Sequence, residues 1–122
     1  MEWNFRPDAP IYAQLVEQLT AAIAAGVFAP GDRLPAVREL ALDAGVNPNT
    51  VQRALSELER SGLVYSQRTA GRFVTEDAQR VAVERDFLAR RHGEAFFAAM
   101  ERLGYDRVQA AMFLEQMGRE EP

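Results

Sequence analysis

The chain has 122 residues, 48% of them hydrophobic and 26% charged, and this composition is that of an ordinary globular protein rather than a disordered one. The length allows one small domain with an appendage and excludes two full domains. A formal net charge of −4 gives no sign of a uniformly basic surface, and the absence of cysteine excludes disulfide frameworks, thiolate metal sites and cysteine nucleophiles.

The N-terminal residues 1–5 lack both the basic segment and the apolar segment of a signal peptide. No apolar run approaches the roughly 20 residues that are needed to cross a bilayer. We therefore expect a cytoplasmic protein with no membrane partner. A first helix is predicted over residues 10–25, ending at Gly26. Its apolar residues recur at helical spacing: Ile11, Leu15, Leu19, Ala22 and Ile23.

A helix-turn-helix is predicted next. Pro35 is expected to open its first helix, because the residue before a proline is pushed towards an extended conformation, and Gly45 is expected to end it. Asn47 can cap the following helix through its side-chain oxygen. Pro48 suits the first helical position, where its missing N–H has no cost. The tight link from Gly45 to Asn47 has the length found between two crossed helices.

The polar face of the helix that starts at Pro48 carries amide and guanidinium groups on its first two turns: Asn49, Gln52, Arg53 and Ser56. Asn and Gln can pair bidentately with adenine, and Arg with guanine. We therefore interpret this helix as a DNA recognition helix. The alternative is an ordinary solvated helix face, which the surrounding helix-turn-helix and hairpin disfavour.

Residues 63–67 and 71–75 are rich in β-branched, aromatic or alternating residues, and the short connection between them predicts a hairpin. A helix-turn-helix followed by a hairpin is a winged helix. Arg68 and Arg72 flank the tip beside Gly71, which lets the backbone approach a phosphate or a minor groove closely. For Arg72, an exposed strand charge is an equally good interpretation.

From about residue 77 the pattern predicts one long amphipathic helix, weakened at Gly93, followed by a break at Gly104 and a last helix capped by Asp106. Two helices cannot bury their apolar faces alone, so we expect the same pair from a second copy to cover them. The expected dimer contacts are Phe87, Phe96, Met100, Leu103, Val108 and Met112. The predicted fold is mainly α with a small β-hairpin. Residues 1–76 form a winged helix-turn-helix DNA-binding domain, and residues 77–122 form a helical dimerisation tail.

Other chemistry has few candidates. His92 is the single histidine, so no metal site is expected. No nucleophile–base pair, carboxylate pair or glycine-rich phosphate loop stands out, so we expect neither an enzyme nor a cofactor. The Phe and Met residues of the tail could line a pocket for a small-molecule effector, although a plain dimer core is favoured. The negative charge also leaves a protein–protein interaction module as an alternative function.

Residues 10–75 resemble the GntR family of bacterial winged-helix transcription regulators. The matching motifs are Pro30-Gly31-Asp32-Arg33-Leu34-Pro35, Val37-Arg38-Glu39-Leu40-Ala41, Gly45-Val46, Thr50-Val51, Ala54-Leu55, Leu58-Glu59 and Gly62-Leu63-Val64. Together with Pro10-Ile11-Tyr12, the segment from Val46 to Arg53 and the short tail, they look like the YtrA-like subfamily. Other subfamilies carry a large effector-binding or aminotransferase-like domain, for which this chain has no room.

The resemblance implies a homodimer that binds a two-fold-related operator in double-stranded DNA, usually as a repressor. The family positions that reach DNA correspond to Arg38, Asn47, Asn49, Thr50, Gln52, Arg53 and the wing glycine Gly71. Two departures are visible: many relatives have a basic residue at Pro48, and the usual wing, Arg-Gly-x-Gly-Thr-Phe-Val, is here Arg68-Thr69-Ala70-Gly71-Arg72-Phe73-Val74.

Overall fold

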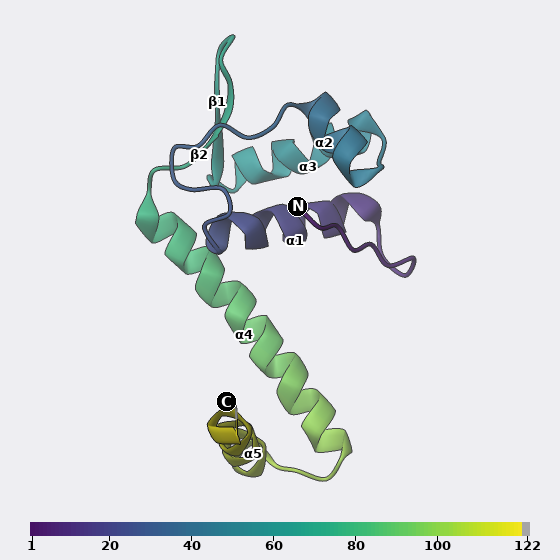
Figure 1. Cartoon of the computed structure of the whole chain (residues 1–122), viewed down its shortest axis with the longest axis vertical. Helices are drawn as coiled ribbons and strands as arrows, with labels where there is room; N and C mark the ends of the chain where they lie inside the picture. Colours follow the sequence, from purple (N-terminus) through teal and green to yellow (C-terminus); the bar gives the residue numbers. More distant parts are fainter. Residues whose placement is uncertain (121–122) are drawn as a thin grey trace. The chain divides into compact units, whose positions relative to one another are not determined.

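The computed structural model describes residues 1–120 and has a mainly helical fold with one hairpin, as predicted (Figure 1). Its elements are α1 (Ile11–Ala24), α2 (Val37–Ala44), α3 (Pro48–Arg60), β1 (Val64–Gln67), β2 (Gly71–Val74), α4 (Ala78–Arg102) and α5 (Arg107–Glu120). The chain divides into two compact units, Met1–Arg85 and a second unit that begins at Asp86. The division falls inside α4.

The core of the first unit lies between α1, α2 and α3. From the predicted apolar stripe of α1, Leu15 and Leu19 are almost completely buried there, whereas Ile11 at its start is exposed. Val51 and Leu55 of α3 are almost completely buried beside them. Burying such a side chain contributes about 1.5–3 kcal/mol to folding. This packing holds α1 and α3 side by side, so that residues of both helices border the same surface (Figure 1).

Local capping determines how α2 and α3 begin. Asn47 caps α3 as predicted, because its side-chain oxygen accepts a hydrogen bond from the Asn49 N–H at 2.8 Å, and Pro48 occupies the first helical position. In contrast to the prediction, α2 starts at Val37 and not at Pro35. The Glu39 carboxylate accepts a hydrogen bond from the N–H of Ala36, which stays extended as the N-cap.

The hairpin forms with the predicted strands, pairing Val64 with Val74 and Gln67 with Gly71. A loop from α1 to α2 runs along the outer edge of β2. Leu34 N–H donates to the Arg72 carbonyl at 2.8 Å, and Val74 N–H donates to the Asp32 carbonyl at 2.8 Å. These bonds occupy the backbone groups of β2 that face away from β1, so the base of the wing is held against the helices.

The first turns of α4 belong to the first unit. Arg80 donates to the Ser61 carbonyl at the end of α3, and Arg85 donates to the Ala24 carbonyl at the end of α1. Both contacts satisfy helix C-terminal carbonyls that lack intrahelical donors. The buried Val81 adds an apolar contact to the same core.

The second unit contains the rest of α4 and the described part of α5. Helix α4 continues through Gly93 without a break. Asp106 caps α5 as predicted, because its side-chain oxygen accepts a hydrogen bond from the Gln109 N–H at 2.8 Å. The Gln109 side-chain oxygen in turn accepts a hydrogen bond from the Asp106 N–H. Met100 and Ala110 are buried. No helix within residues 1–120 combines the length and the apolarity that a membrane span needs.

Candidate nucleic-acid interface

Helix α3 presents a polar face opposite its buried stripe. Asn49, Gln52 and Arg53, which we call the recognition face, are exposed, whereas Val51, Ala54, Leu55 and Leu58 are buried. Thr50 is half-buried beside this face. The amide and guanidinium groups therefore stand on a helix whose other side is fixed in the core. Such a helix is narrow enough to enter a major groove, where those groups can read base edges.

Asn47 has a structural task before any contact with DNA. Its side-chain oxygen already accepts the capping hydrogen bond of α3, whereas its amide NH₂ can donate to another partner. The cap also orients the first turn, on which Asn49 lies.

Arg38 lies on the second residue of α2 and is exposed. The two acids that could have paired with it are engaged elsewhere: Glu39 accepts from the Ala36 N–H, and Asp43 accepts from the Trp3 indole N–H at 2.7 Å. Within residues 1–120, Arg38 forms no ion pair. Its guanidinium is therefore available to an external anion such as a phosphate.

Arg53 does not project freely into solvent. Its guanidinium carbon lies 3.6 Å from the centroid of the Tyr12 ring on α1. This is the distance of a close cation–π stack. Tyr12 is half-buried at the edge of the core.

The wing binds back to α3 through Arg72. Its Nε donates to Glu59 Oε1 of α3 at 2.6 Å, and Glu59 also accepts from the Ser66 hydroxyl of β1. The Ser66 hydrogen bond and the Arg72 guanidinium hold the pKa of Glu59 below its ordinary value. Arg72 therefore neutralises an acid of the protein itself, and neither of the two sequence-based interpretations of Arg72 anticipated this pair.

The wing tip keeps Arg68 exposed. Beside it, Thr69 has a φ of 65°, in the left-handed region that β-branched residues rarely adopt. The Ala70 N–H donates to the Gln67 carbonyl and closes this turn.

Arg33 supports the wing in a way that sequence reasoning missed. Its Nε donates to the Ala70 carbonyl at 3.0 Å, and a Cβ added to Gly71 would lie 2.9 Å from the same nitrogen. Gly71 thus leaves space for the Arg33 side chain, in addition to adopting a φ of 112°. Arg33 was part of a recognised motif, but nothing in the spacing links it to the wing, 37 residues away.

The six residues proposed for dimerisation differ in exposure. Phe87, Leu103, Val108 and Met112 are exposed, with Leu103 at 73% and Met112 at 64%, whereas Met100 is only 8% exposed and Phe96 is half-buried. Met100 is therefore already part of the core of its own unit. The exposed four leave a considerable apolar surface open on the second unit.

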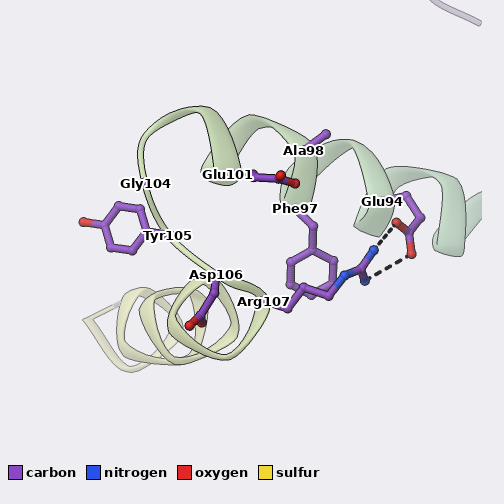
Figure 2. A pocket seen from close by; sticks show the side chains of 8 residues that line it. All are labelled: Glu94, Phe97, Ala98, Glu101, Gly104, Tyr105, Asp106 and Arg107. Carbon is purple, nitrogen blue, oxygen red and sulfur yellow. Dashed lines mark hydrogen bonds and ion pairs between the residues drawn. The ribbon is translucent and has the colours of Figure 1, made fainter.

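A pocket of about 490 Å³ lies where α4 turns into α5 (Figure 2). Arg107 pairs with Glu94 at 2.6 Å, and its guanidinium carbon lies 4.6 Å from the centroid of the Phe97 ring. This pair lowers the pKa of Glu94 and raises that of Arg107. Tyr105, Glu101 and Asp106 complete much of the lining. The wall combines two aromatic rings with an excess of acids.

His92 is exposed on α4. Within residues 1–120, no three histidine, aspartate or glutamate side chains are grouped so that they could hold a metal ion.

Comparisons with known sequences agree with this architecture. The family model described as bacterial regulatory proteins, gntR family, matches residues 11–74. The chain is 41% identical over 104 residues to the uncharacterized HTH-type transcriptional regulator YhcF of Bacillus subtilis, covering 85% of this chain and 86% of YhcF. It is 43% identical over 79 residues to the HTH-type transcriptional repressor YtrA of the same organism, covering 65% of this chain and 61% of YtrA.

Solved structures show the same likeness. A GntR family transcriptional regulator from Listeria monocytogenes superposes with a TM-score of 0.83 at 35% identity, covering 92% of this chain and 98% of that one. The DNA-binding domain AraR(DBD), solved in complex with operator ORX1, superposes with a TM-score of 0.57 at 31% identity, covering 62% of this chain and 96% of that one.

Proposed function

The chain belongs to the GntR family of bacterial regulatory proteins, and from this premise we propose that it is a cytoplasmic repressor that binds a two-fold-related operator as a homodimer. The members of this family are DNA-binding transcription regulators and not enzymes. The observation that carries the proposal is the recognition face, which stands exposed on a helix that is capped at its start and anchored in the core. In this proposal α3 enters the major groove, Arg38 contacts a phosphate, and the wing with Arg68 lies along the neighbouring backbone.

The tail supports the homodimer. Its exposed apolar residues need a partner, and a closed two-fold pair is the commonest way in which identical chains cover such surfaces. A dimer would hold two copies of α3 at a fixed separation, so that the tail would determine the spacing of the operator half-sites. Repression is supported by the likeness to YtrA, which is named a repressor.

A titration tests the proposal directly. The purified protein is titrated by fluorescence anisotropy against the DNA upstream of its own gene, at two salt concentrations, with random duplex as competitor. We expect binding that survives the competitor and weakens with salt, because phosphate contacts release counterions. Footprinting of the same fragment would then give the half-site spacing. Equal affinity for all fragments and for random duplex would contradict sequence-specific binding.

That negative result would favour the alternative, a winged-helix protein–protein interaction module. The recognition face argues against it, since protein-binding surfaces are enriched in aromatic residues at their centre, whereas the three exposed side chains of this face are amide or cationic.

The pocket between α4 and α5 favours a second activity, control of DNA binding by a small molecule. Its aromatic and acidic lining suits a cationic or aromatic compound. Such a compound would raise the melting temperature of the protein and change its operator affinity, and Glu101→Gln should reduce both effects. A compound that stabilises the protein without changing DNA binding would not be an effector.

A further inference from the structure

Tyr12 and Arg53 are 41 positions apart in the chain and belong to two helices that pack against each other. Tyr12 lies on the first turn of α1, and Arg53 lies on the second turn of α3. The buried stripes of both helices fix the backbones, so the ring of Tyr12 is held beside the recognition face. The guanidinium carbon of Arg53 then lies 3.6 Å from the centre of that ring.

The stack limits the orientations of Arg53. A free arginine on a helix surface samples many rotamers, whereas a planar guanidinium over an aromatic face is restricted to positions parallel to the ring. A stack at this distance uses the face of the guanidinium, so the N–H edge can still donate to a ligand. Within residues 1–120, Arg53 forms no ion pair that would compete for that edge.

The surroundings of the stack are open. Tyr12 and Arg53 line a shallow recess of about 350 Å³ together with Ile11, Asn49 and Thr50. Two residues of the recognition face therefore border the same recess as the Tyr12 ring. A recess of this size leaves room for a ligand group beside Tyr12 and Arg53.

We propose that Tyr12 is a positioning residue that orients Arg53 for a forked contact with guanine and thereby determines base preference at one position of each half-site. A forked contact to guanine O6 and N7 needs the guanidinium in the plane of the base, and pre-orienting it reduces the entropy lost on binding. The inference rests on the proposed DNA-binding function, and it gives a role in specificity to a residue of α1, outside the helix-turn-helix.

A double-mutant cycle tests the proposal on the full-length chain. The proteins are the wild type, Tyr12→Ala, Tyr12→Phe, Arg53→Ala and the double variant Tyr12→Ala/Arg53→Ala. Each is titrated against the upstream fragment that the wild type selects, against the same fragment with each guanine of the half-site replaced in turn, and against random duplex. Circular dichroism melting of every variant checks that it is folded.

We expect Tyr12→Ala to weaken operator binding by about 3- to 30-fold and to weaken the preference for one guanine. Binding to random duplex and the salt dependence should be unchanged, because no charge is removed. Tyr12→Phe keeps the ring and should bind like the wild type. In the Arg53→Ala background, Tyr12→Ala should cost nothing further, because Tyr12 acts through Arg53.

Several outcomes would overturn the proposal. Additive losses in the double variant would mean that Tyr12 acts independently of Arg53, and tighter operator binding by Tyr12→Ala would mean that the ring withholds Arg53 from DNA. A loss that Tyr12→Phe shares would assign the effect to the hydroxyl. These results differ from failure of the proposed function, in which the wild type itself prefers no fragment over random duplex.

Discussion

Individual side chains on α2 and α3 should carry most of the operator affinity, and those on α3 the sequence specificity. Gln52→Ala removes one amide from the recognition face, and Arg38→Ala removes an exposed guanidinium that forms no ion pair within residues 1–120. We expect each change to weaken operator binding by about 1–3 kcal/mol, with Gln52→Ala acting on base preference and Arg38→Ala acting on all sequences alike. Anisotropy titrations against operator and random duplex separate the two effects.

Arg60→Ala is the matched control for Arg38→Ala. Arg60 is also an exposed arginine, but it lies at the far end of α3 and is paired with Glu57 at 2.6 Å. Its removal lowers the net charge equally and should change operator affinity by less than about 0.5 kcal/mol. If Gln52→Ala and Arg38→Ala bind the operator as tightly as the wild type and the Arg60→Ala control do, the assignment of Gln52 and Arg38 as DNA contacts is wrong.

The wing turn stores strain at a single residue. Thr69 has a φ of 65°, which glycine adopts at no steric cost and which a β-branched side chain resists. We expect Thr69→Gly to stabilise the protein by about 0.5–1 kcal/mol, since the relief of strain exceeds the extra flexibility of glycine in the unfolded chain. Thermal or urea unfolding measures the change.

The neighbouring Ala70 provides the control for that substitution. It has a negative φ, so Ala70→Gly gains no relief of strain and should destabilise the protein slightly. Equal effects of the two glycine substitutions would show that the turn is not strained at Thr69.

At the scale of elements, the wing and α3 are coupled through Glu59. Glu59→Gln removes the charge that pairs with Arg72 and accepts from Ser66. We expect Glu59→Gln to lower the free energy of unfolding by about 0.5–1 kcal/mol, which is near the upper end of the range for partly exposed ion pairs. Glu57→Gln, which affects an exposed pair within α3, is the control and should change stability much less.

The same carboxylate makes the stability of the first unit depend on pH. The pKa of Glu59 is lower in the folded protein than in the unfolded chain, because the hydrogen bond from Ser66 and the Arg72 guanidinium stabilise the charged form. Its contribution is complete above the unfolded pKa and is lost as the pH falls through the folded pKa. The difference in unfolding free energy between wild type and Glu59→Gln should therefore shrink on acidification. A difference that stays constant would exclude this coupling.

How far the sequence predicted these elements depends on the range of the interactions involved. The cap of α3 at Asn47, the start at Pro48 and the two strands follow from residues within a few positions of each other, and all were predicted correctly. The predicted start of α2 at Pro35 is two residues too early. The helix starts at Val37, because the Glu39 side chain accepts a hydrogen bond from the Ala36 N–H and keeps Ala36 outside the helix. The stack of Tyr12 with Arg53, the Arg72–Glu59 pair and the support of the wing by Arg33 join residues between 13 and 41 positions apart. Periodicity and turn chemistry carry no information about such contacts, which arise only when the helices pack.

For the whole molecule, the proposed homodimer makes the tail essential for operator binding. Met112 is 64% exposed on α5, one turn after Val108. Met112→Glu places a charge on the surface that a second copy would cover, and desolvating an unpaired charge is costly. We expect this variant to be monomeric by sedimentation or light scattering while keeping the fold of its first unit.

Val27→Glu is the control, because Val27 is 61% exposed and lies in the first unit, after α1. It exchanges an equally exposed apolar residue for the same charge and should remain dimeric. Operator binding by Met112→Glu should fall by about 10²–10⁴-fold, since the second recognition helix is then no longer tethered to the first. Binding to an isolated half-site should be unchanged, which separates loss of the dimer from damage to the recognition face. A Met112→Glu protein that stays dimeric would place the interface elsewhere, and a monomer that binds the full operator as tightly as the wild type would show that a single copy is sufficient.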